Sequence, residues 1–215
     1  MTTELWHLGD QYAGQTIDPA TCDPDPFVEV RRWLASAVAH PVPQANAMTV
    51  ATIDERGRPA ARVVLLKEVD EHGFVFYTNY DSRKGHDLAA HPSVALVMWW
   101  EPLHRQIRIE GAIEKVDAEM SDVYFASRPR GSQIGAIASP QSQVIESRTA
   151  LEAMVAKVER THGDAAPPRP SYWGGYRVVP DAIELWQGQQ SRLHDRVVYR
   201  RTALDSAWIR ERLAP

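Results

Sequence analysis

Cysteine is almost absent from this chain. Cys22 is the only one, so no disulfide can form within the chain and no cysteine-based metal site can be built. The eight histidines include no pair at the H-E-x-x-H spacing, and no metal site is expected. No apolar run approaches the roughly 20 residues of a membrane-spanning helix, so no membrane partner is expected. The first residues lack the basic and then apolar pattern of a signal peptide, which favours a cytoplasmic location.

A basic charge balance and the common nucleotide-binding motifs are missing as well. With 24 Lys and Arg against 28 Asp and Glu, the net charge of -4 argues against a general nucleic-acid binder. Neither G-x-G-x-x-G nor a Walker A motif occurs, so any nucleotide cofactor must be held in another way. The 215 residues, 44% of them hydrophobic, are enough for a well-formed core.

The patterning predicts a mainly β chain with peripheral helices, in the α+β class. Residues 1–25 are polar and rich in Pro and Asp, which predicts a flexible arm ahead of a single domain at 26–215. Helical spacing covers 26–38, 82–90, 118–127 and 145–161. Strand patterns cover 47–53, 62–67, 74–79, 94–100, 106–116, 176–179, 183–186, 192–200 and 208–213. Gly-containing turns between several of these strands are typical of antiparallel meanders, so we expect an antiparallel barrel.

The segment 192–196 is the most informative stretch. If it is extended, Arg192, His194 and Arg196 project from one face. Two fixed cations beside a titratable imidazole suit an anionic ligand that exchanges protons or hydride. The alternative is an edge strand whose charges only prevent aggregation.

A second candidate lies where a helix is expected to begin. Asp81 or Ser82 can cap this helix, leaving free N–H groups beside Arg83 and Lys84. Helix N-termini and cations both bind phosphate, although the segment also fits a capped surface helix.

Further candidates flank an apolar run and line a predicted helix. Arg62 and Lys67 differ in parity, so on a regular strand they face opposite sides and can serve two anions, or they are simply charges at the ends of a buried run. Tyr124 and Arg128 lie four residues apart on a helix, with Ser132 following. They can form a phosphate cradle, although such a pair is also common on helix surfaces.

Neutral polar residues and tryptophans complete the set. Gln106 and the pair Gln141-Ser142 can bind the edge of a heteroaromatic ring, or are ordinary polar loop positions. Trp99, Trp100 and Trp173 are interpreted as core or interface aromatics.

Together these blocks give the chain a family resemblance. The matching stretches are Arg62–Lys67, Phe76–Asn79, Ser82–Lys84, Arg105-Gln106, Tyr124-Phe125, Ser127–Arg130, Ser132–Gly135, Gln141-Ser142, Trp173–Gly175, Trp186–Gly188, Arg192–Arg196 and Arg212–Pro215. In this order they resemble the pyridoxine/pyridoxamine 5′-phosphate oxidase family, from about Phe27 to the last residue.

The resemblance implies an FMN-binding split barrel that acts as a homodimer with FMN at the subunit interface. The implied FMN contacts are Arg62, Val63, Val64, Leu65, Leu66, Lys67, Tyr77, Thr78, Arg83, Lys84 and Gln106, with Gln141, Ser142, Trp186 and Arg196 supplied by the second subunit. The implied substrate contacts are Lys67, Tyr124, Arg128 and Ser132 for a phosphate, and Arg192 and His194 for a pyridine ring.

The activity that the resemblance implies is oxidation of pyridoxine or pyridoxamine 5′-phosphate to pyridoxal 5′-phosphate, with O2 reduced to H2O2. Arg192 and His194 are the implied catalytic residues. Two alternatives stay open: a related flavin oxidase acting on another anionic ring, as in phenazine-type biosynthesis, and a non-catalytic protein that binds flavin or pyridoxal phosphate.

The chain also departs from the family pattern at its start. Basic residues that often precede a tyrosine closing over the substrate are missing, so Tyr12 alone is expected to act as a lid. Gln44-Ala45 stands where an acidic residue and a proline are frequent. Neither difference involves the FMN contacts.

Overall fold

The computed structural model describes residue 12 and residues 14–215, and it divides into two compact units. Unit 1 comprises the residues up to Met48, Leu96–Glu110 and Pro180–Pro215. Unit 2 comprises Thr49–Ala95 and Gly111–Val179. The long strands β5 (Ser93–Trp100), β6 (Arg105–Lys115) and β7 (Trp173–Gln187) contribute residues to both.

The strands follow one hydrogen-bonded order, β2-β1-β5-β6-β7-β4-β3, with β8 joined to β7 and β9 to β8. The remaining strands are β1 (Ala47–Ile53), β2 (Pro59–Leu65), β3 (Glu68–Val69), β4 (Phe74–Asn79), β8 (Asp195–Arg200) and β9 (Ile209–Arg212). The pairs β3–β4, β4–β7, β7–β8 and β8–β9 are antiparallel. The expected antiparallel, mainly β architecture is confirmed.

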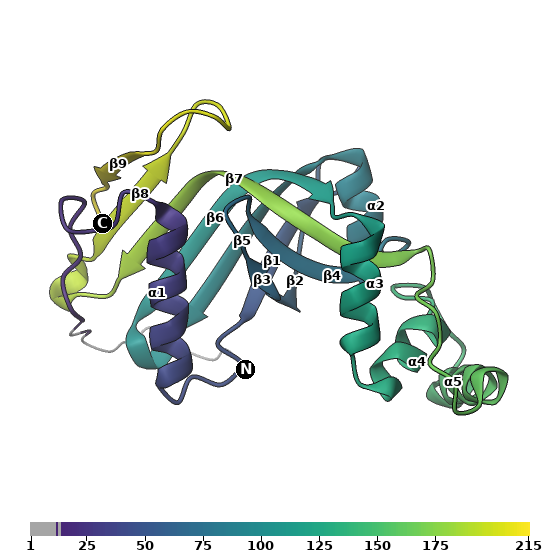
Figure 1. Ribbon diagram of the computed structural model, residues 1–215. Helices are drawn as coiled ribbons and strands as arrows, with labels where there is room; N and C mark the ends of the chain where they lie inside the picture. Colours follow the sequence, from purple (N-terminus) through teal and green to yellow (C-terminus); the bar gives the residue numbers. More distant parts are fainter. Residues whose placement is uncertain (1–11, 13) are drawn as a thin grey trace, which may run out of the picture. The chain divides into compact units, whose positions relative to one another are not determined.

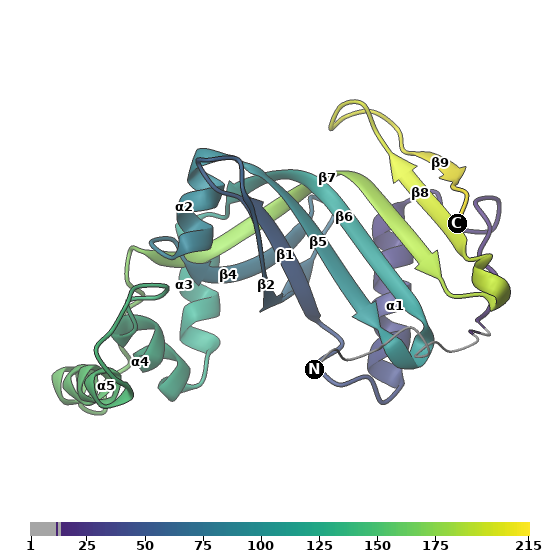
Figure 2. The ribbon, with the colours of Figure 1, turned by 180° about the vertical axis from the view of Figure 1, so that it is seen from behind.

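In unit 1, helix α1 (Pro26–Ala39) packs beside the sheet. Asp25 caps it by accepting a hydrogen bond from the Phe27 amide, and Pro26 supplies a preset φ at the first turn. Its buried face includes Val30, Trp33 and Ala37, and the Arg105 guanidinium of β6 lies over the Trp33 ring. The short helix η1 (Glu101–Leu103) links β5 to β6, and η2 (Gln190–Arg192) links β7 to β8. Figures 1 and 2 show the β8–β9 hairpin close to the residues that precede α1.

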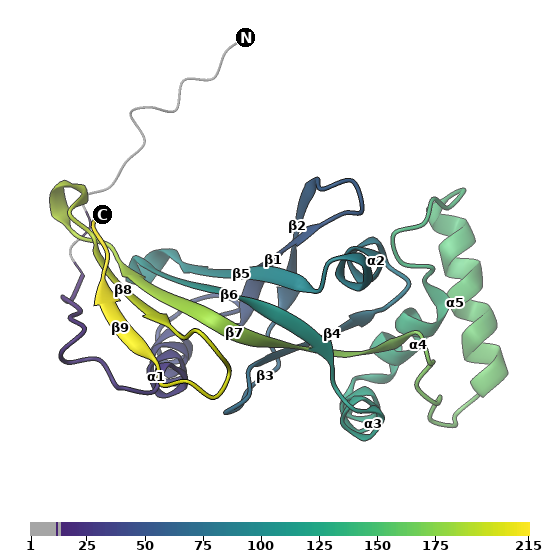
Figure 3. The ribbon, with the colours of Figure 1, turned by 90° about the horizontal axis from the view of Figure 1, so that it is seen from above.

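In unit 2, β4 pairs with the first half of β7 from Phe74↔Val178 to Asn79↔Trp173. Four helices belong to this unit: α2 (Arg83–Ala90), α3 (Ala118–Ser127), α4 (Arg130–Ala138) and α5 (Arg148–His162). Helices α4 and α5 pack against each other, as Figure 3 shows. No helix in the described part of the chain is long and apolar enough to cross a membrane.

Several element boundaries differ from the sequence expectation. Strand β2 ends at Leu65, so Lys67 lies beyond it. Helix α4 was not predicted, and the two strands expected at 176–179 and 183–186 are one strand, β7. Strand β8 begins only at Asp195, so Arg192 is not on it.

The expected flexible arm is described only in part. Residues 1–11 and 13 lie outside the described residues. Residues 14–25 contain no helix or strand, but Ile17 and Cys22 are buried. The mobility of the arm therefore stays a prediction.

Candidate functional site

Unit 2 contains a cavity of about 500 Å³ that we call the basic cavity. It is lined by Arg62, Val63, Val64, Leu65, Lys67, Tyr77, Thr78, Lys84, Tyr124, Arg128, Pro129, Ser132, Gln141 and Trp173. Four of these residues are cationic and none is a carboxylate. A cavity with this balance of charges is suited to a multiply charged anion.

Hydrogen bonds within the protein fix the position of the Arg62 side chain. Its Nη1 donates to the Val50 carbonyl at 3.1 Å and to Thr52 Oγ1 at 2.7 Å. Its Nη2 lies 3.4 Å from Asp87 Oδ2, which also accepts a 2.6 Å hydrogen bond from Thr52. The buried Asp87 therefore orients the guanidinium from α2.

Lys84 brings a buried cation to the cavity from the first turn of α2. Its side chain donates from Nζ to Thr78 Oγ1 at 3.0 Å, Ser82 Oγ at 3.0 Å and Gln141 Oε1 at 2.6 Å. Burial, reinforced by the nearby Arg62 charge, lowers the pKa of Lys84 to about 8. Gly85 allows this turn to approach the chain, since a Cβ there would lie 1.8 Å from the Tyr80 carbonyl oxygen.

Aromatic rings form one wall of the cavity. Tyr77 stacks on Tyr124 with ring centroids 3.9 Å apart, and both rings lie nearly parallel to Trp173. The Arg128 guanidinium lies over the Trp173 ring, 4.6 Å from its centroid. Its Nη1 is buried and has no hydrogen-bond partner among the described residues, and burial lowers the pKa of Arg128. A buried unpaired donor is costly in free energy, and an anionic ligand would satisfy it.

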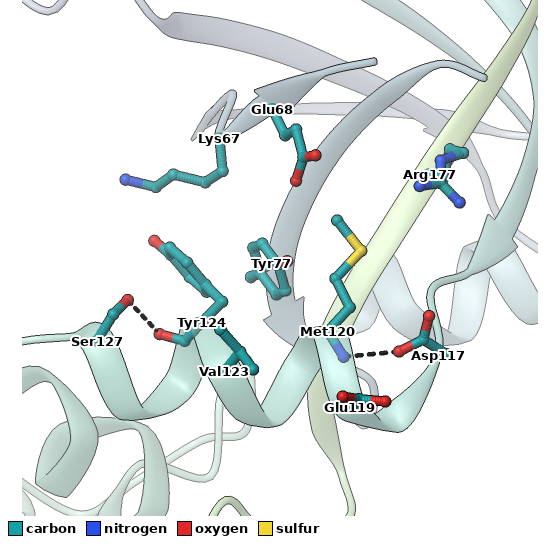
Figure 4. Close-up of a pocket in the computed structure, with 10 residues that line it drawn as sticks. All are labelled: Lys67, Glu68, Tyr77, Asp117, Glu119, Met120, Val123, Tyr124, Ser127 and Arg177. Atoms are coloured by element: carbon teal, nitrogen blue, oxygen red, sulfur yellow. Dashed lines mark hydrogen bonds between the residues drawn. The ribbon is translucent and has the colours of Figure 1, made fainter. Parts of the chain in front are cut away.

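A second, larger cavity of about 590 Å³ adjoins the same wall. Figure 4 shows it between α3 and the strands, with Lys67, Tyr77 and Tyr124 shared with the basic cavity. Its lining also includes Glu68, Asp117 and Glu119. Because these carboxylates would repel a phosphate, we identify the smaller basic cavity as the candidate site.

In unit 1, an aromatic cluster surrounds His194. The imidazole lies 4.5 Å from the Trp186 ring and 5.8 Å from the Tyr12 ring, centroid to centroid. His194 Nδ1 accepts a hydrogen bond from the Gln189 amide at 3.1 Å, so the neutral tautomer carries its proton on Nε2. Burial, followed by the Arg192 charge, lowers the pKa of His194 below its usual 6.5. At neutral pH His194 Nε2 is therefore a neutral donor.

Arg192 and Arg196 differ in their surroundings. Arg192 is exposed and has a left-handed backbone with φ 60°, following Ser191 at φ 56°. Non-glycine residues rarely adopt this conformation, and when they do they are often at functional sites. Arg196 lies opposite Trp186 in the β7–β8 register and donates to both carboxylate oxygens of Glu184, at 2.8 and 3.0 Å.

The structure brings together much of the predicted set and corrects the expectations that depended on regular helix or strand geometry. Arg62 and Lys67 line the same cavity and do not face opposite sides, because β2 ends before Lys67. The expected cradle of Tyr124, Arg128 and Ser132 lies beside them. Gln141, expected to act from a second subunit, contacts Lys84 of its own chain.

Other predicted residues lie elsewhere. Leu66 is buried outside the cavity lining, Arg83 is exposed at the start of α2, and Ser142 is exposed with φ 74°. Gln106, Trp186, Arg192, His194 and Arg196 belong to unit 1. The roles implied for all these residues stay predictions.

Residues that support the site were missed by sequence reasoning. Asp87 and Thr52 accept hydrogen bonds from Arg62 and orient it. Glu184 accepts a hydrogen bond from Arg196. The ring of Trp173 lies under the guanidinium of Arg128. Trp173 was expected in a core or interface. The others gave no sequence signal, because each acts through a contact that is distant along the chain.

Comparison with known proteins shows the family to which the chain belongs. Residues 34–162 match the family model described as pyridoxamine 5′-phosphate oxidase, and residues 173–215 match the pyridoxine 5′-phosphate oxidase C-terminal dimerisation region. The pyridoxine/pyridoxamine 5′-phosphate oxidase of Burkholderia cenocepacia is 56% identical over 214 residues, covering 99% of this chain and 100% of that protein. The enzyme of the same name from Paraburkholderia phytofirmans is 54% identical, with the same coverage.

Solved structures share the fold. PhzG from Burkholderia lata, in complex with tetrahydrophenazine-1-carboxylic acid, aligns with a TM-score of 0.89 at 28% identity, covering 96% of this chain and 100% of that one. A pyridoxamine 5′-phosphate oxidase-related, FMN-binding protein from Nostoc punctiforme aligns at 0.69 with 16% identity, covering 86% of this chain and 95% of that one. The split-barrel fold expected from the sequence is confirmed, and this chain belongs to the pyridoxamine 5′-phosphate oxidase family.

Proposed function

We propose that this chain acts as an FMN-dependent homodimer that oxidises pyridoxine 5′-phosphate or pyridoxamine 5′-phosphate to pyridoxal 5′-phosphate. O2 is reduced to H2O2, and the amine substrate also consumes water and releases ammonia. The observation that carries the proposal is the basic cavity, which has four cationic residues and no carboxylate in its lining. Relatives named for this activity support it, since they match 99% of the chain.

The residues present fit FMN. Arg62 and Lys84 are two cations at one end of the lining, with Thr78 and Gln141 as neutral partners. Lys84 makes its hydrogen bonds to neutral oxygens, so the FMN phosphate would supply the anion that it lacks. FMN supplies the redox chemistry when bound.

A second phosphate would be held by Lys67, Tyr124, Arg128 and Ser132. The buried, unpartnered Nη1 of Arg128 supports this assignment, because a substrate phosphate would relieve its desolvation. The stacked rings of Tyr77, Tyr124 and Trp173 fix the position of this cradle.

At the ring end, Arg192 and His194 would act on the pyridine. His194 would donate from Nε2 to a substrate oxygen and exchange a proton there. Arg192 would orient the ring and stabilise negative charge that develops on it during oxidation.

The second candidate is oxidation of a carboxylated, phenazine-type ring, and the similarity to PhzG favours it. A carboxylate needs fewer cations than the two phosphates that the basic cavity can accommodate. The third candidate, a flavin or pyridoxal phosphate carrier, would bind ligand without consuming oxygen.

Oxygen consumption distinguishes these functions. We expect the FMN-loaded protein to consume O2 with either phosphorylated vitamer and not with a partly reduced phenazine carboxylic acid. Oxygen uptake with the phenazine carboxylic acid, and with neither vitamer, would support the second candidate. Binding of pyridoxal phosphate without oxygen uptake would support the third.

The lowered pKa of Lys84 predicts a pH dependence of FMN affinity. Above pH 8 free Lys84 loses its proton, so phosphate binding must be accompanied by proton uptake. We expect the FMN dissociation constant to rise by up to about tenfold per pH unit above this value. Quenching of FMN fluorescence between pH 6.5 and 9.5 measures the affinity. If the dissociation constant of Lys84→Met rose with pH as steeply as that of wild type, Lys84 would not be the group that binds the FMN phosphate.

The same shift affects the stability of the apo-protein. Between pH 8 and 10.5 Lys84 keeps its proton in the unfolded chain but not in the folded one, so the free energy of unfolding of the apo-protein rises with pH over this range.

A further inference from the structure

The residues just before α1 are fixed to the C-terminal hairpin by a charged network. Arg212 of β9 donates to Asp195 Oδ1 at 2.6 Å, to Asp18 Oδ2 at 2.8 Å and to the Ile17 carbonyl at 3.0 Å. Asp195 Oδ2 in turn accepts from the Ile17 amide at 3.3 Å and from Gln189 at 2.9 Å. We call Tyr12 with residues 14–18 the N-terminal strap. Its last two residues are therefore bound through both backbone and side chain.

Glycines permit close contact at the other end of the strap. A Cβ on Gly14 would lie 2.0 Å from Gln187 Nε2 and 2.7 Å from the Gly188 carbonyl oxygen. A Cβ on Gly188 would lie 2.9 Å from the Tyr12 ring and from His104 Cβ. The strap thus lies directly on the end of β7, with no room for a side chain between them.

This docking places the Tyr12 ring in the His194 cluster. The ring centroid lies 4.5 Å from His104, 5.8 Å from His194 and 6.0 Å from Trp186. Ile17 and Asp18 lie five and six residues after Tyr12, so release of this anchor is expected to change the position of the ring. The anchor is therefore a means of setting the position of the ring.

We propose that Asp18, Asp195 and Arg212 are positioning residues that hold Tyr12 beside His194 and so set substrate affinity. The consequence for affinity rests on the proposed function and on the expectation from the sequence that Tyr12 closes over the substrate. Asp195 follows His194 in the sequence, and its carboxylate accepts a hydrogen bond from the side chain of Gln189. The backbone N–H of Gln189 donates to His194 Nδ1.

Arg212→Ala and Asp18→Asn test the network. Asp18→Asn keeps the side-chain volume and the turn at Ala20, so it should fold even if Arg212→Ala does not. We expect either variant to raise KM for pyridoxine 5′-phosphate by about tenfold, with kcat and FMN retention unchanged. Arg200→Ala is the matched control, because its 3.7 Å pair with Glu211 lies on the same hairpin and does not involve the strap.

A double-mutant cycle separates positioning from general destabilisation. If Arg212 acts through Tyr12, Arg212→Ala should add nothing to the KM of Tyr12→Ala. Additive effects, or an unchanged KM in Arg212→Ala and Asp18→Asn, would overturn the proposal.

Two further readouts do not depend on activity. The Ile17 amide should exchange its hydrogen faster in Asp18→Asn than in wild type, and chymotrypsin should cleave faster after Tyr12. Wild-type exchange and cleavage in both variants would contradict the anchoring. Faster exchange and cleavage without any vitamer oxidation would support the anchoring and reject the proposed function.

Discussion

Arg192→Ala is expected to lower turnover of pyridoxine 5′-phosphate by about 10²- to 10³-fold while FMN stays bound. The guanidinium is exposed on a left-handed turn next to the Trp186–His194 cluster, where it is available to a substrate ring. Steady-state oxygen uptake and the flavin absorbance after dialysis measure the two effects.

The size of the loss distinguishes catalysis from binding. A group that stabilises developing charge lowers kcat, whereas one that only anchors the substrate raises KM. Arg192→Lys should recover little, because an ammonium lacks the planar donor pair of a guanidinium. Wild-type turnover in Arg192→Ala would remove its proposed role.

Lys84→Met is expected to weaken FMN binding by about 10- to 150-fold without destabilising the apo-protein. The substitution removes a charge-assisted contact to the phosphate but keeps a long, apolar side chain. Because the cation is buried without a directly bonded carboxylate, its removal also relieves a desolvation cost. Titration of the apo-protein with FMN and thermal unfolding measure both quantities.

Lys157→Met is the matched control for charge, because Lys157 is exposed on α5 and lies outside the basic cavity. It should leave the FMN dissociation constant unchanged. Equal FMN affinity in Lys84→Met and wild type would contradict the assignment of this end of the cavity to the cofactor phosphate.

Elements with strong local signals were predicted well from the sequence. Asp25 followed by Pro26 marked the first turn of α1, and the structure begins the helix there. Ser82 was one of two expected caps of α2, and its side chain accepts from the Gly85 amide. Strand β1 matches its predicted bounds, because its alternating pattern places every second side chain in the core.

The sequence prediction missed elements in which tertiary packing overrides the local preference of the residues for helix or strand. Helix α4 contains Gly131 and Gly135, which lower its helix propensity, and packing against α5 compensates. The two strands expected at 176–179 and 183–186 form one strand, β7, although Pro180 lies within it. Pro180 lies between the β7 residues paired with β4 and those paired with β8, so one continuous strand accommodates it.

In the candidate site, too, contacts that depend on the tertiary structure could not be predicted from the sequence. Tyr124, Arg128 and Ser132 line one cavity as expected, but not for the expected reason: α3 ends at Ser127, so Arg128 is its extended C-cap, and Ser132 lies on α4. The expected common face of Arg192 and His194 depended on an extended segment, and the left-handed turn at Ser191 and Arg192 removes that basis. The pairing of Lys84 with Gln141 could not be predicted from spacing, since 57 residues separate them.

The most direct test of the central claim is anaerobic mixing of the FMN-loaded protein with pyridoxine 5′-phosphate while the absorbance of oxidised flavin is recorded. We expect loss of that absorbance, its recovery when air is admitted, and formation of pyridoxal 5′-phosphate. A yellow protein whose absorbance does not change with either phosphorylated vitamer would contradict it.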